Sequence, residues 1–332
     1  MDETAWLADR FEEHRAQLLR VAYRMLGSLA EADDAVQDSW IRVSRSGARE
    51  VENLSGWLTT IVAHVCLNKL RSRTVRREDF FGVHLPDPVI SPDGELQPEE
   101  EVLLADSVGL ALLIVLDTLS PAERLAFVLH DIFDLPFEEI APMVGRTPSA
   151  ARQLASRARR RVKGAAVPTP DADIARQREV VDAFFLAARA GEFAALVAVL
   201  DPEVVLRIDA GTKHPAASMV VHGAEAVARQ TLTGLSQVIA HPAAHLCPAV
   251  VNGAAGVIFT LGGRPMTVMG FTVAGDKVAE IDAIADPDRV RRVSAAALAD
   301  FHEPGRTMMS GIGPRPGRAT TGQPPGVGGE EL

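Results

Sequence analysis

The feature that most constrains this chain is the close succession of helix start and stop signals across residues 120–163. Ser120, with Glu123 three residues later, is a capping box, in which each side chain satisfies a free backbone amide at a helix N-terminus. Gly145 is suited to end a helix, because glycine readily adopts the positive φ of a C-terminal cap. Thr147, followed directly by a proline, starts another helix. Short helices around a three-residue turn at 145–147 predict a helix-turn-helix.

The helix after this turn is strongly basic in an otherwise acidic chain. Residues 145–163 hold seven basic residues and no acidic one, whereas the 332-residue chain has a formal net charge of −10. Arginine and glutamine make paired hydrogen bonds to base edges in the major groove, and further cations neutralise phosphates. The pattern favours DNA binding over the alternative of a solvated basic helix. The predicted contacts are Ser149, Arg152, Gln153, Ser156, Arg157 and Arg160.

The N-terminal part is also predicted to be helical and carries an acidic cluster. Ser28 and Glu31 form another capping box at the start of one helix. Opposite the apolar face of that helix lies a group of acidic and amide side chains. It is either a solvated surface or a docking surface for a basic partner. We call it the acidic cluster, and it consists of Asp33, Asp34, Gln37 and Asp38.

The helix predicted from residue 54 onward has a second face suited to nucleic acid. Residues 69–77 contain five basic residues and no acid, and a polar loop at 44–53 precedes the helix. His64 taken alone would more often be an ordinary surface histidine. The exposed face is predicted to contain His64, Asn68, Lys69 and Arg71.

Composition changes divide the chain into helical domains at 1–77 and 107–163, an α+β domain at 174–300 and three connecting or terminal segments. Residues 78–106 carry nine acids and four prolines without any Lys or Arg, which predicts an extended acidic linker. A short linker is predicted at 164–173, and a Gly- and Pro-rich disordered tail at 301–332. The α+β domain begins with a helix, followed by short Val- and Ile-rich runs between hairpin-type turns, which indicates an antiparallel sheet.

Other classes of protein fit poorly. No apolar run reaches the roughly 18 residues of a membrane helix, and the acidic N-terminus does not resemble a signal peptide. Cys66 and Cys247 are far apart and lack metal-ligand spacing, so two unpaired thiols are expected. We therefore expect a cytoplasmic protein that needs neither a metal nor a cofactor.

Residues 5–163 resemble the extracytoplasmic-function (ECF) sigma factors of bacterial RNA polymerase. "AYRMLGSLAEADDAVQDSWIRV" is similar to their segment that binds the β′ clamp, and "NLSGWLTTIVAHVCLNKLRSR" to the segment that opens and reads the −10 element. "LSPAERLAFVLHDIFDLPFEEIAPMVGRTPSAARQLASRARRRV" is similar to the segment that reads the −35 element and contacts the β flap. The resemblance implies that core RNA polymerase and promoter DNA are the partners. It implies that the basic helix reads the −35 element and that residues 64–71 read the −10 element. It also implies that loop 44–53 holds a flipped base of the −10 element and that the acidic cluster binds the β′ clamp of the polymerase. It also implies that the linker threads a basic channel of the polymerase, for which its acidity is suited.

Residues 174–293 resemble the SnoaL-like domains of the NTF2-like superfamily, cone-shaped folds that some ECF sigma factors, the sigma-J type, carry as an extension. The matching motifs are "DAGTK" at 209–213, "VVNGAAG" at 250–256 and "DPDRV" at 286–290. Ala210 and Thr212 stand where the first motif usually has glycine. The resemblance implies a role in regulating the sigma domains of the same chain. The residues expected to take part are Asp209, Gly211, Lys213, Asp286, Pro287 and Asp288.

Two other functions remain open from the sequence. The C-terminal domain could bind or transform a small metabolite in a pocket, with Asp209, His214, His222 and Asp282 as acid–base candidates. The chain could also be a helix-turn-helix regulator that never joins polymerase. We expect a non-enzymatic sigma factor, because the acidic cluster and the second basic helix are not needed by a simple repressor.

Overall fold

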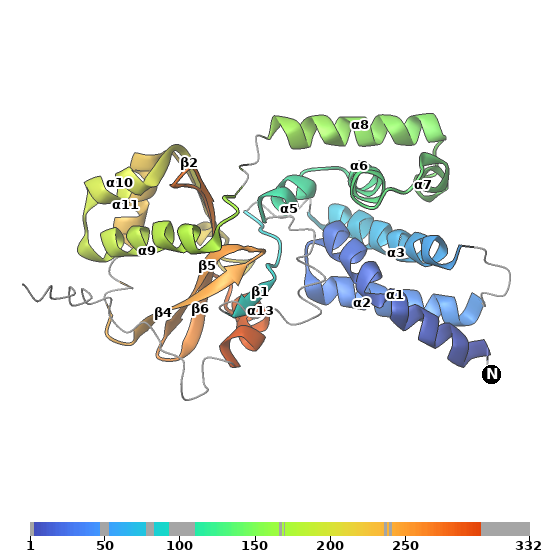
Figure 1. The fold of residues 1–332 in the computed structure, drawn as a ribbon, viewed down its shortest axis with the longest axis horizontal. Coiled ribbons are helices and arrows are strands. Elements are labelled where there is room, and N and C mark those ends of the chain that lie inside the picture. Colours follow the sequence, from blue (N-terminus) through green and yellow to red (C-terminus); the bar gives the residue numbers. More distant parts are fainter. Residues whose placement is uncertain are drawn as a thin grey trace, which may run out of the picture.

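A computed structural model of the protein describes residues 3–46, 53–77, 83–92, 110–165, 168, 170–235, 238 and 241–299. Figure 1 shows two helical domains on the right and a sheet with its covering helices on the left. The predicted tail and parts of both linkers lie outside the described residues.

The N-terminal domain is a bundle of three helices that pack along their apolar faces. They are α1 (Glu3–Leu26), α2 (Leu29–Ser46) and α3 (Leu54–Arg77). The rings of Phe11 and Trp40 lie 5.2 Å apart and join α1 to α2. The bundle therefore holds the acidic cluster on α2 and the basic face of α3 in a fixed relation.

The second helical domain contains the predicted helix-turn-helix. Its elements are α5 (Leu110–Asp117), α6 (Pro121–Phe127), a π-helical turn η1 (Val128–Ile132), α7 (Phe137–Val144) and α8 (Pro148–Gly164). The predicted caps are confirmed: Ser120 and Glu123 form the capping box, Gly145 has a φ of 65°, and Thr147 caps α8. Three small residues of α8 are fully buried and allow close packing: Ala151, Ala155 and Ala158.

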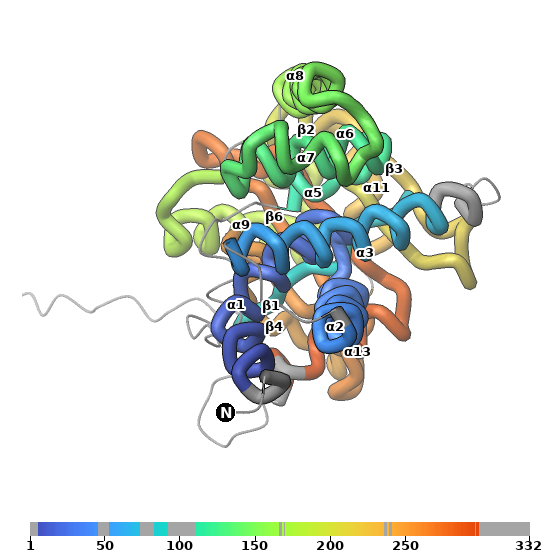
Figure 2. The backbone as a smooth tube through the Cα atoms, turned by 90° about the vertical axis from the view of Figure 1, so that its right-hand side faces the viewer, coloured from blue at the N-terminus to red at the C-terminus, as the bar shows by residue number. Residues whose placement is uncertain are grey.

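The two helical domains share one continuous core. α6 and α7 pack against α3, and α8 lies on the far side of α6 and α7 in both views (Figures 1 and 2). Arg124 is buried at this junction, where its Nε donates to the backbone oxygen of Arg24 at 3.1 Å. Its Nη1 donates to a carboxylate oxygen of Asp117 at 2.9 Å. The described arrangement of the helical domains is therefore compact.

The C-terminal domain is the predicted α+β fold. Its helical elements are α9 (Ile174–Ala190), α10 (Phe193–Val199), η2 (Pro215–Ala217), α11 (Ala224–Gly234) and α13 (Pro287–Ala299). Its own strands are β2 (Leu200–Asp209), β3 (Met219–His222), β4 (Ala244–Val251), β5 (Ala254–Leu261), β6 (Arg264–Ala274) and β7 (Lys277–Ile284). Asn252 and Gly253, with φ of 49° and 79°, make the predicted tight turn between β4 and β5.

The sheet differs from the prediction in one pairing. Its strand order is β1-β4-β5-β6-β7-β2-β3. Most neighbours are antiparallel, as expected, but β2 and β7 are parallel. The cause is that β2 enters the sheet beside the last strand of the β4–β7 meander, a long-range pairing that short hairpin turns do not reveal. The sheet is therefore mixed.

The edge strand β1 (Ile90–Pro92) comes from the predicted linker. It pairs antiparallel with β4, with Ile90 opposite Val251 and Pro92 opposite Ala249. A proline is tolerated there because an edge strand needs only half of its backbone groups for pairing. The described part of the linker is thus extended, as predicted, but it is bound to the C-terminal sheet and not simply suspended between two helical domains.

The two faces of the sheet have different cover. One face packs against α9 and α11 around Phe184 and Phe271. The other face packs against the linker and α13, and Ile114 of α5 also contacts it. In Figure 1, β1 and α13 lie between the sheet and the helical domains. At the second face the linker, α5, α13 and the sheet therefore meet.

Candidate nucleic-acid interface and linker-binding site

The outward face of α8 displays the predicted base-reading side chains. Ser149, Arg152, Gln153 and Arg160 are exposed, and Ser156 is half-buried. The guanidinium of Arg152 lies 5.2 Å from the centre of the Phe137 ring, a cation–π distance that limits its motion. The face can therefore present at least one pre-oriented arginine to a groove.

Arg157 is exposed but has an internal partner. Its Nε lies 3.6 Å from Oε1 of Glu123. The other carboxylate oxygen of Glu123 accepts a hydrogen bond from Arg161 at 3.2 Å. Hydrogen bonds from Ser120 and these guanidiniums outweigh the opposing effect of desolvation and lower the pKa of Glu123. The side chain of Arg157 is 54% exposed, and the buried carboxylate of Glu123 keeps Ser120 and Arg161 as hydrogen-bond partners without it. A phosphate can therefore compete for Arg157 at small cost.

On α3 the predicted residues separate into two groups. Asn68 and Arg71 are exposed, whereas His64 is half-buried and its pKa is lowered by burial and by Arg42 and Arg71. Lys69 lies 3.5 Å from Asp38, a member of the acidic cluster. Lys69 therefore lies beside the acidic cluster, which is the predicted polymerase-binding surface, as well as on the helix predicted to read the −10 element. The loop predicted to hold a flipped base lies largely outside the described residues.

The acidic cluster on α2 is only partly neutralised from within the chain. Asp33 accepts from Arg15 at 2.6 Å and from Gln37 at 2.7 Å. Asp34 is exposed and has no partner among the described residues. Beside the cluster runs a groove of about 410 Å³ between α1 and α2 that sequence reasoning missed. It is lined in part by Phe11, Trp40 and Ile41, the last of which is 48% exposed.

Asp209 at the end of β2 binds the linker directly. Its side chain is 1% exposed, and one oxygen accepts from the backbone N–H of Leu85 at 2.9 Å. The other oxygen accepts from the N–H of Gly211 at 2.9 Å, which fixes the carboxylate in place. A carboxylate buried this deeply needs such partners to remain charged. Asp209 was among the residues predicted to regulate the sigma domains, but no pattern in the sequence indicated that it contacts the linker.

Arg289 on α13 completes this contact. Its guanidinium donates to Asp209 at 2.5 Å, to Asp87 of the linker at 2.7 Å and to the backbone oxygen of Leu85 at 2.6 Å. Burial favours loss of its proton, but the two carboxylates raise the pKa of Arg289 overall. The residue was present in the "DPDRV" motif, yet only the fold shows that it faces the linker.

A second contact holds the other end of the same linker segment. The side-chain oxygen of Asn252 accepts from the N–H of Val89 at 2.7 Å, and the N–H of Asn252 donates to the oxygen of Val89 at 2.9 Å. Asn252 Nδ2 also donates to the hydroxyl of Tyr23 on α1 at 3.3 Å. The Tyr23 hydroxyl donates to the backbone oxygen of Asp87 at 2.9 Å, and burial raises its pKa. The N–H of Asp87 donates to the oxygen of Gly27 at 2.7 Å.

Residues 84–90 are therefore bound by the C-terminal domain and by the N-terminal bundle, and we call this site the linker clamp. From the C-terminal domain come Asp209, Asn252 and Arg289, and from the N-terminal bundle Tyr23 and Gly27. No pattern in the sequence connected these distant positions to one another.

The other predicted regulatory residues lie around the start of α13, the helix that carries Arg289. Asp286 Oδ1 accepts from the N–H groups of Asp288 and Arg289, both at 2.9 Å, and so begins α13 where Pro287 is its first residue. Gly211 has a φ of 76°, and a Cβ there would lie 1.9 Å from Asp286. Lys213 pairs with Asp288 at 2.5 Å on the surface. Of the loop 209–213, only Asp209 is seen to reach the linker.

The acid–base candidates do not converge on a pocket. Asp209 serves the clamp, and His214 and His222 are exposed. Asp282 pairs with Arg207 at 3.1 Å, and burial raises its pKa to about 7. A cavity of about 230 Å³ lies between α11 and the sheet. Its described lining has no acidic, basic or histidine side chain, so the arrangement offers no acid–base pair.

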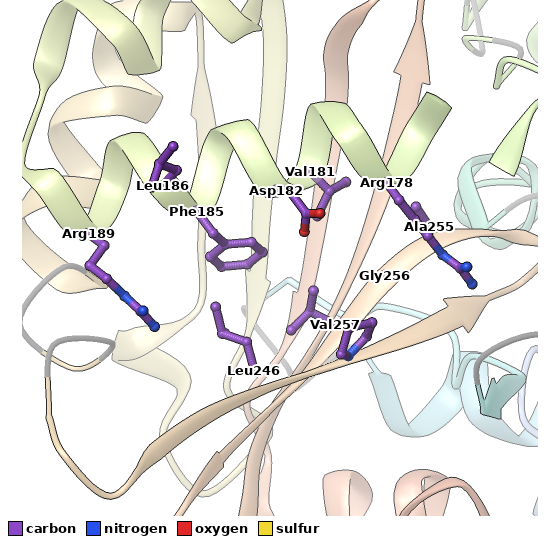
Figure 3. A pocket seen from close by; sticks show the side chains of 11 residues that line it. Arg178, Val181, Asp182, Phe185, Leu186, Arg189, Leu246, Ala255, Gly256 and Val257 are labelled. Atoms are coloured by element: carbon purple, nitrogen blue, oxygen red, sulfur yellow. The ribbon is translucent and has the colours of Figure 1, made fainter. Parts of the chain in front are cut away.

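A second hollow lies between α9 and strands β4 and β5 (Figure 3). Phe185 points into it from α9 and Val257 from β5 on the opposite side, and Asp182 lies between two arginines of α9. Burial raises the pKa of Asp182. The hollow measures only about 50 Å³, room for a few water molecules.

Comparison with known proteins identifies the family. Residues 10–76 match Sigma-70 region 2, and residues 110–162 match Sigma-70, region 4. The ECF RNA polymerase sigma factor SigJ of Mycobacterium tuberculosis strain H37Rv is 39% identical over 290 residues, which cover 84% of this chain and 91% of SigJ. This chain belongs to the ECF RNA polymerase sigma factors.

Other relatives extend the match into the C-terminal domain of this sigma factor. The probable ECF RNA polymerase sigma factor SigI of the same strain is 35% identical over 286 residues, covering 85% of this chain and 92% of SigI. The crystal structure of Mycobacterium tuberculosis SigJ superposes with a TM-score of 0.67 at 35% identity, covering 85% of this chain and 97% of that one. The predicted sigma domains and the SnoaL-like, NTF2-like cone are thereby confirmed. Sigma factors are transcription initiation factors that act with RNA polymerase and carry out no catalysis of their own, so this chain is not a regulator that never joins polymerase. No helix in the described part of the chain is long and apolar enough to cross a membrane.

Proposed function

We propose that this sigma factor binds core RNA polymerase in the cytoplasm, reads the −35 element with α8 and the −10 element with α3, and is held inactive by its own C-terminal domain through the linker clamp. The observation that carries the proposal is that one linker segment is bound by both the N-terminal bundle and the C-terminal domain. Leu85 and Val89 each donate a backbone N–H to a buried side chain of the C-terminal domain. A linker bound in this way is not available to a polymerase channel.

The compact arrangement of the helical domains supports an inactive state. The −35 and −10 elements are about 25 base pairs apart, which is roughly 85 Å of DNA at about 3.4 Å per base pair. α8 and α3 are separated by the single layer formed by α6 and α7 (Figure 1). Helices with side chains are about 10–12 Å across. The two reading faces must therefore move apart before both elements can be bound.

The surface for polymerase is proposed to combine the acidic cluster with the neighbouring groove between α1 and α2. Charged groups steer association, while buried aromatic and aliphatic anchors hold a complex. The exposed Ile41 beside Trp40 supplies such an anchor in the groove, which Gln37 of the acidic cluster also lines. Asp34 also lines a cavity of about 440 Å³ together with Asp87 of the linker and Arg292 of α13. The clamp therefore lies close to the surface that polymerase would need.

Run-off transcription with purified core polymerase tests this function. Three proteins are compared: the full chain, a chain ending at Lys163 and a chain ending at Ala299. Removal of the C-terminal domain frees the linker, so the first truncation should raise transcription, whereas the second retains the clamp and should change it little. Unchanged transcription from the chain ending at Lys163 would contradict inhibition. Reduced transcription, with intact helical content, would instead indicate that the domain helps to hold polymerase.

A further inference from the structure

The cavity between α11 and the sheet has a lining that defines the chemistry of a possible occupant. Its walls are mainly aliphatic and aromatic, with Phe184, Leu206, Met269 and Ile281 among them. Its polar side chains are all neutral: Gln230, Thr231 and Thr267. A charged molecule would lose its hydration there and gain no counter-ion among the described lining residues, which is strongly unfavourable.

The size of the cavity also restricts the occupant. An apolar cavity of about 150 Å³ inside a protein is large enough to bind benzene. The volume here is about 230 Å³, which suits a molecule of roughly bicyclic aromatic size by the same scale. The cavity reaches the surface beside Gly234 and Leu235, of which the first is exposed and the second half-buried. Entry therefore does not require the sheet to open.

We propose that this cavity binds a neutral, largely apolar small molecule with one or two hydrogen-bonding groups, and that the bound molecule strengthens the linker clamp. The effect on the clamp rests on the function proposed above, whereas binding itself does not. The proposal makes the C-terminal domain a sensor in which the ligand keeps the sigma factor inactive.

The coupling follows from two chain segments that leave the cavity wall and lead within a few residues to Asp209 and Arg289 of the linker clamp. Ile208 lines the cavity, and the next residue is Asp209. Ala285 lines the cavity, and the next residue is Asp286, which begins α13. The N–H of Ala285 donates to the backbone oxygen of Asp209 at 2.7 Å and ties the two strand ends together.

The direction of the effect follows from the state in which the cavity is formed. With the linker bound, Asp209 and Arg289 hold the ends of β2 and α13 together. Release of the linker takes the Leu85 N–H from Asp209 and the Asp87 carboxylate from Arg289, which loosens these ends and therefore the wall that contacts the ligand. A ligand stabilises the state that binds it better, and the coupling is reciprocal between the two sites.

Three naphthalene compounds that differ mainly in charge test the binding site. They are 1-naphthalenemethanol, which is neutral, 1-naphthoate, which is anionic, and 1-naphthylmethylammonium, which is cationic. Calorimetric titration of the full chain should show that each charged compound binds at least about tenfold more weakly than the neutral one. Equal affinities, or no binding of the neutral compound, would overturn the assignment.

Variants locate the binding. Ala283→Leu fills the cavity, and Ala285→Leu fills its half-buried rim, which carries less risk of unfolding. Ala279→Leu introduces the same side chain on the same strand outside the cavity lining and serves as control. The first two should abolish binding of 1-naphthalenemethanol while helical content is retained. Binding that survives both in folded protein would place the compound elsewhere and refute the site.

Amide hydrogen exchange at Leu85 and Val89 tests the coupling. Saturating 1-naphthalenemethanol should slow exchange by about tenfold, within the usual range of coupling between sites. By reciprocity, full release of the linker would weaken binding of the compound by the same factor, and Arg289→Ala, which favours release, should weaken it by up to about tenfold. Binding without any change in exchange would refute the coupling. Transcription by Arg289→Ala without the compound reports separately on the proposed function, so the two failures can be distinguished.

Discussion

Replacing Arg289 by alanine should release the linker from the C-terminal domain. The side chain is 13% exposed and donates to Asp209, to Asp87 and to the backbone of Leu85. Arg289→Ala removes all three hydrogen bonds and leaves two buried carboxylates without the guanidinium. Asp209 would keep only its two backbone N–H donors and a histidine 3.6 Å away.

The size of the effect follows from where the energy is lost. Removing one partner of a buried ion pair costs about 3–5 kcal/mol, because the remaining charge stays desolvated. Here the loss falls mainly on the docked linker, because release returns the Asp87 carboxylate to water and removes the linker from above Asp209. Taking about 3 kcal/mol, and 1.4 kcal/mol for each factor of ten, linker docking weakens by roughly 100-fold.

Hydrogen exchange of the full chain, followed by mass spectrometry of a peptide over residues 83–92, measures this change. Exchange at Leu85 and Val89 should accelerate by roughly 100-fold, because local exchange follows the opening equilibrium. Run-off transcription with core polymerase should rise in parallel.

Arg291→Ala is the matched control, two positions further along α13. Arg291 is exposed and pairs with Asp288 on the surface, and such pairs contribute about 0–1 kcal/mol. Exchange in the control should stay within about fivefold of the parent. If Arg289→Ala exchanges no faster than Arg291→Ala, with both proteins folded by circular dichroism, the clamp does not hold the linker.

Four further outcomes are expected. Arg152→Ala should cost about 1–3 kcal/mol against the preferred −35 base and relax specificity at that position; a footprinting titration with unchanged −35 discrimination would contradict it. Charge reversal at Asp34 should reduce co-purification with core polymerase without altering circular dichroism, and an unchanged pull-down would remove it from the docking surface. Asn68→Ala should slow promoter opening measured by permanganate reactivity, and an unchanged rate would exclude a −10 role. Because burial raises the pKa of Asp282 to about 7, from an unfolded value of about 3.9, the folded state holds a proton that the unfolded chain loses first. The free energy of unfolding should therefore fall as pH rises from about 4 to 7, and urea titrations at pH 5 and 8 should show a smaller fall in Asp282→Asn.

The helix boundaries and reading faces were predictable because their signals are local. The cap at Ser120 and the turn at Gly145 depend on side chains and φ angles within a few residues, and the structure has both where the sequence predicts them. The exposure of Arg152 and Asn68 follows from helical periodicity alone. The strands of the β4–β7 meander were likewise predictable from turns such as Asn252–Gly253.

The linker clamp was not predictable because its contacts span long sequence separations. Asn252 meets Val89 across 163 positions, and Arg289 meets Asp87 across 202. Proline and acid content indicated extended chain, which residues 83–92 show, but extended chain is equally compatible with a free segment and with an edge strand. Which of these occurs depends on whether a sheet edge and buried partners are available, and only the fold supplies that information. The motifs at 209–213 and 286–290 contain Asp209 and Arg289, which contact the linker, but nothing in the motifs identifies the linker as the partner.

The charges of the linker explain how one segment can serve two partners. Nine acids in residues 78–106 make the linker attractive to any basic surface. In the clamp, Arg289 neutralises Asp87 at 2.7 Å, and Arg292 lies 3.9 Å from the same carboxylate. The C-terminal domain thus offers this carboxylate the kind of cationic partner that a polymerase channel would offer. Under the proposed function Asp87 cannot occupy both places, so binding of polymerase to the linker and closure of the linker clamp would exclude each other, and a clamp of moderate strength would be enough to set the balance between them.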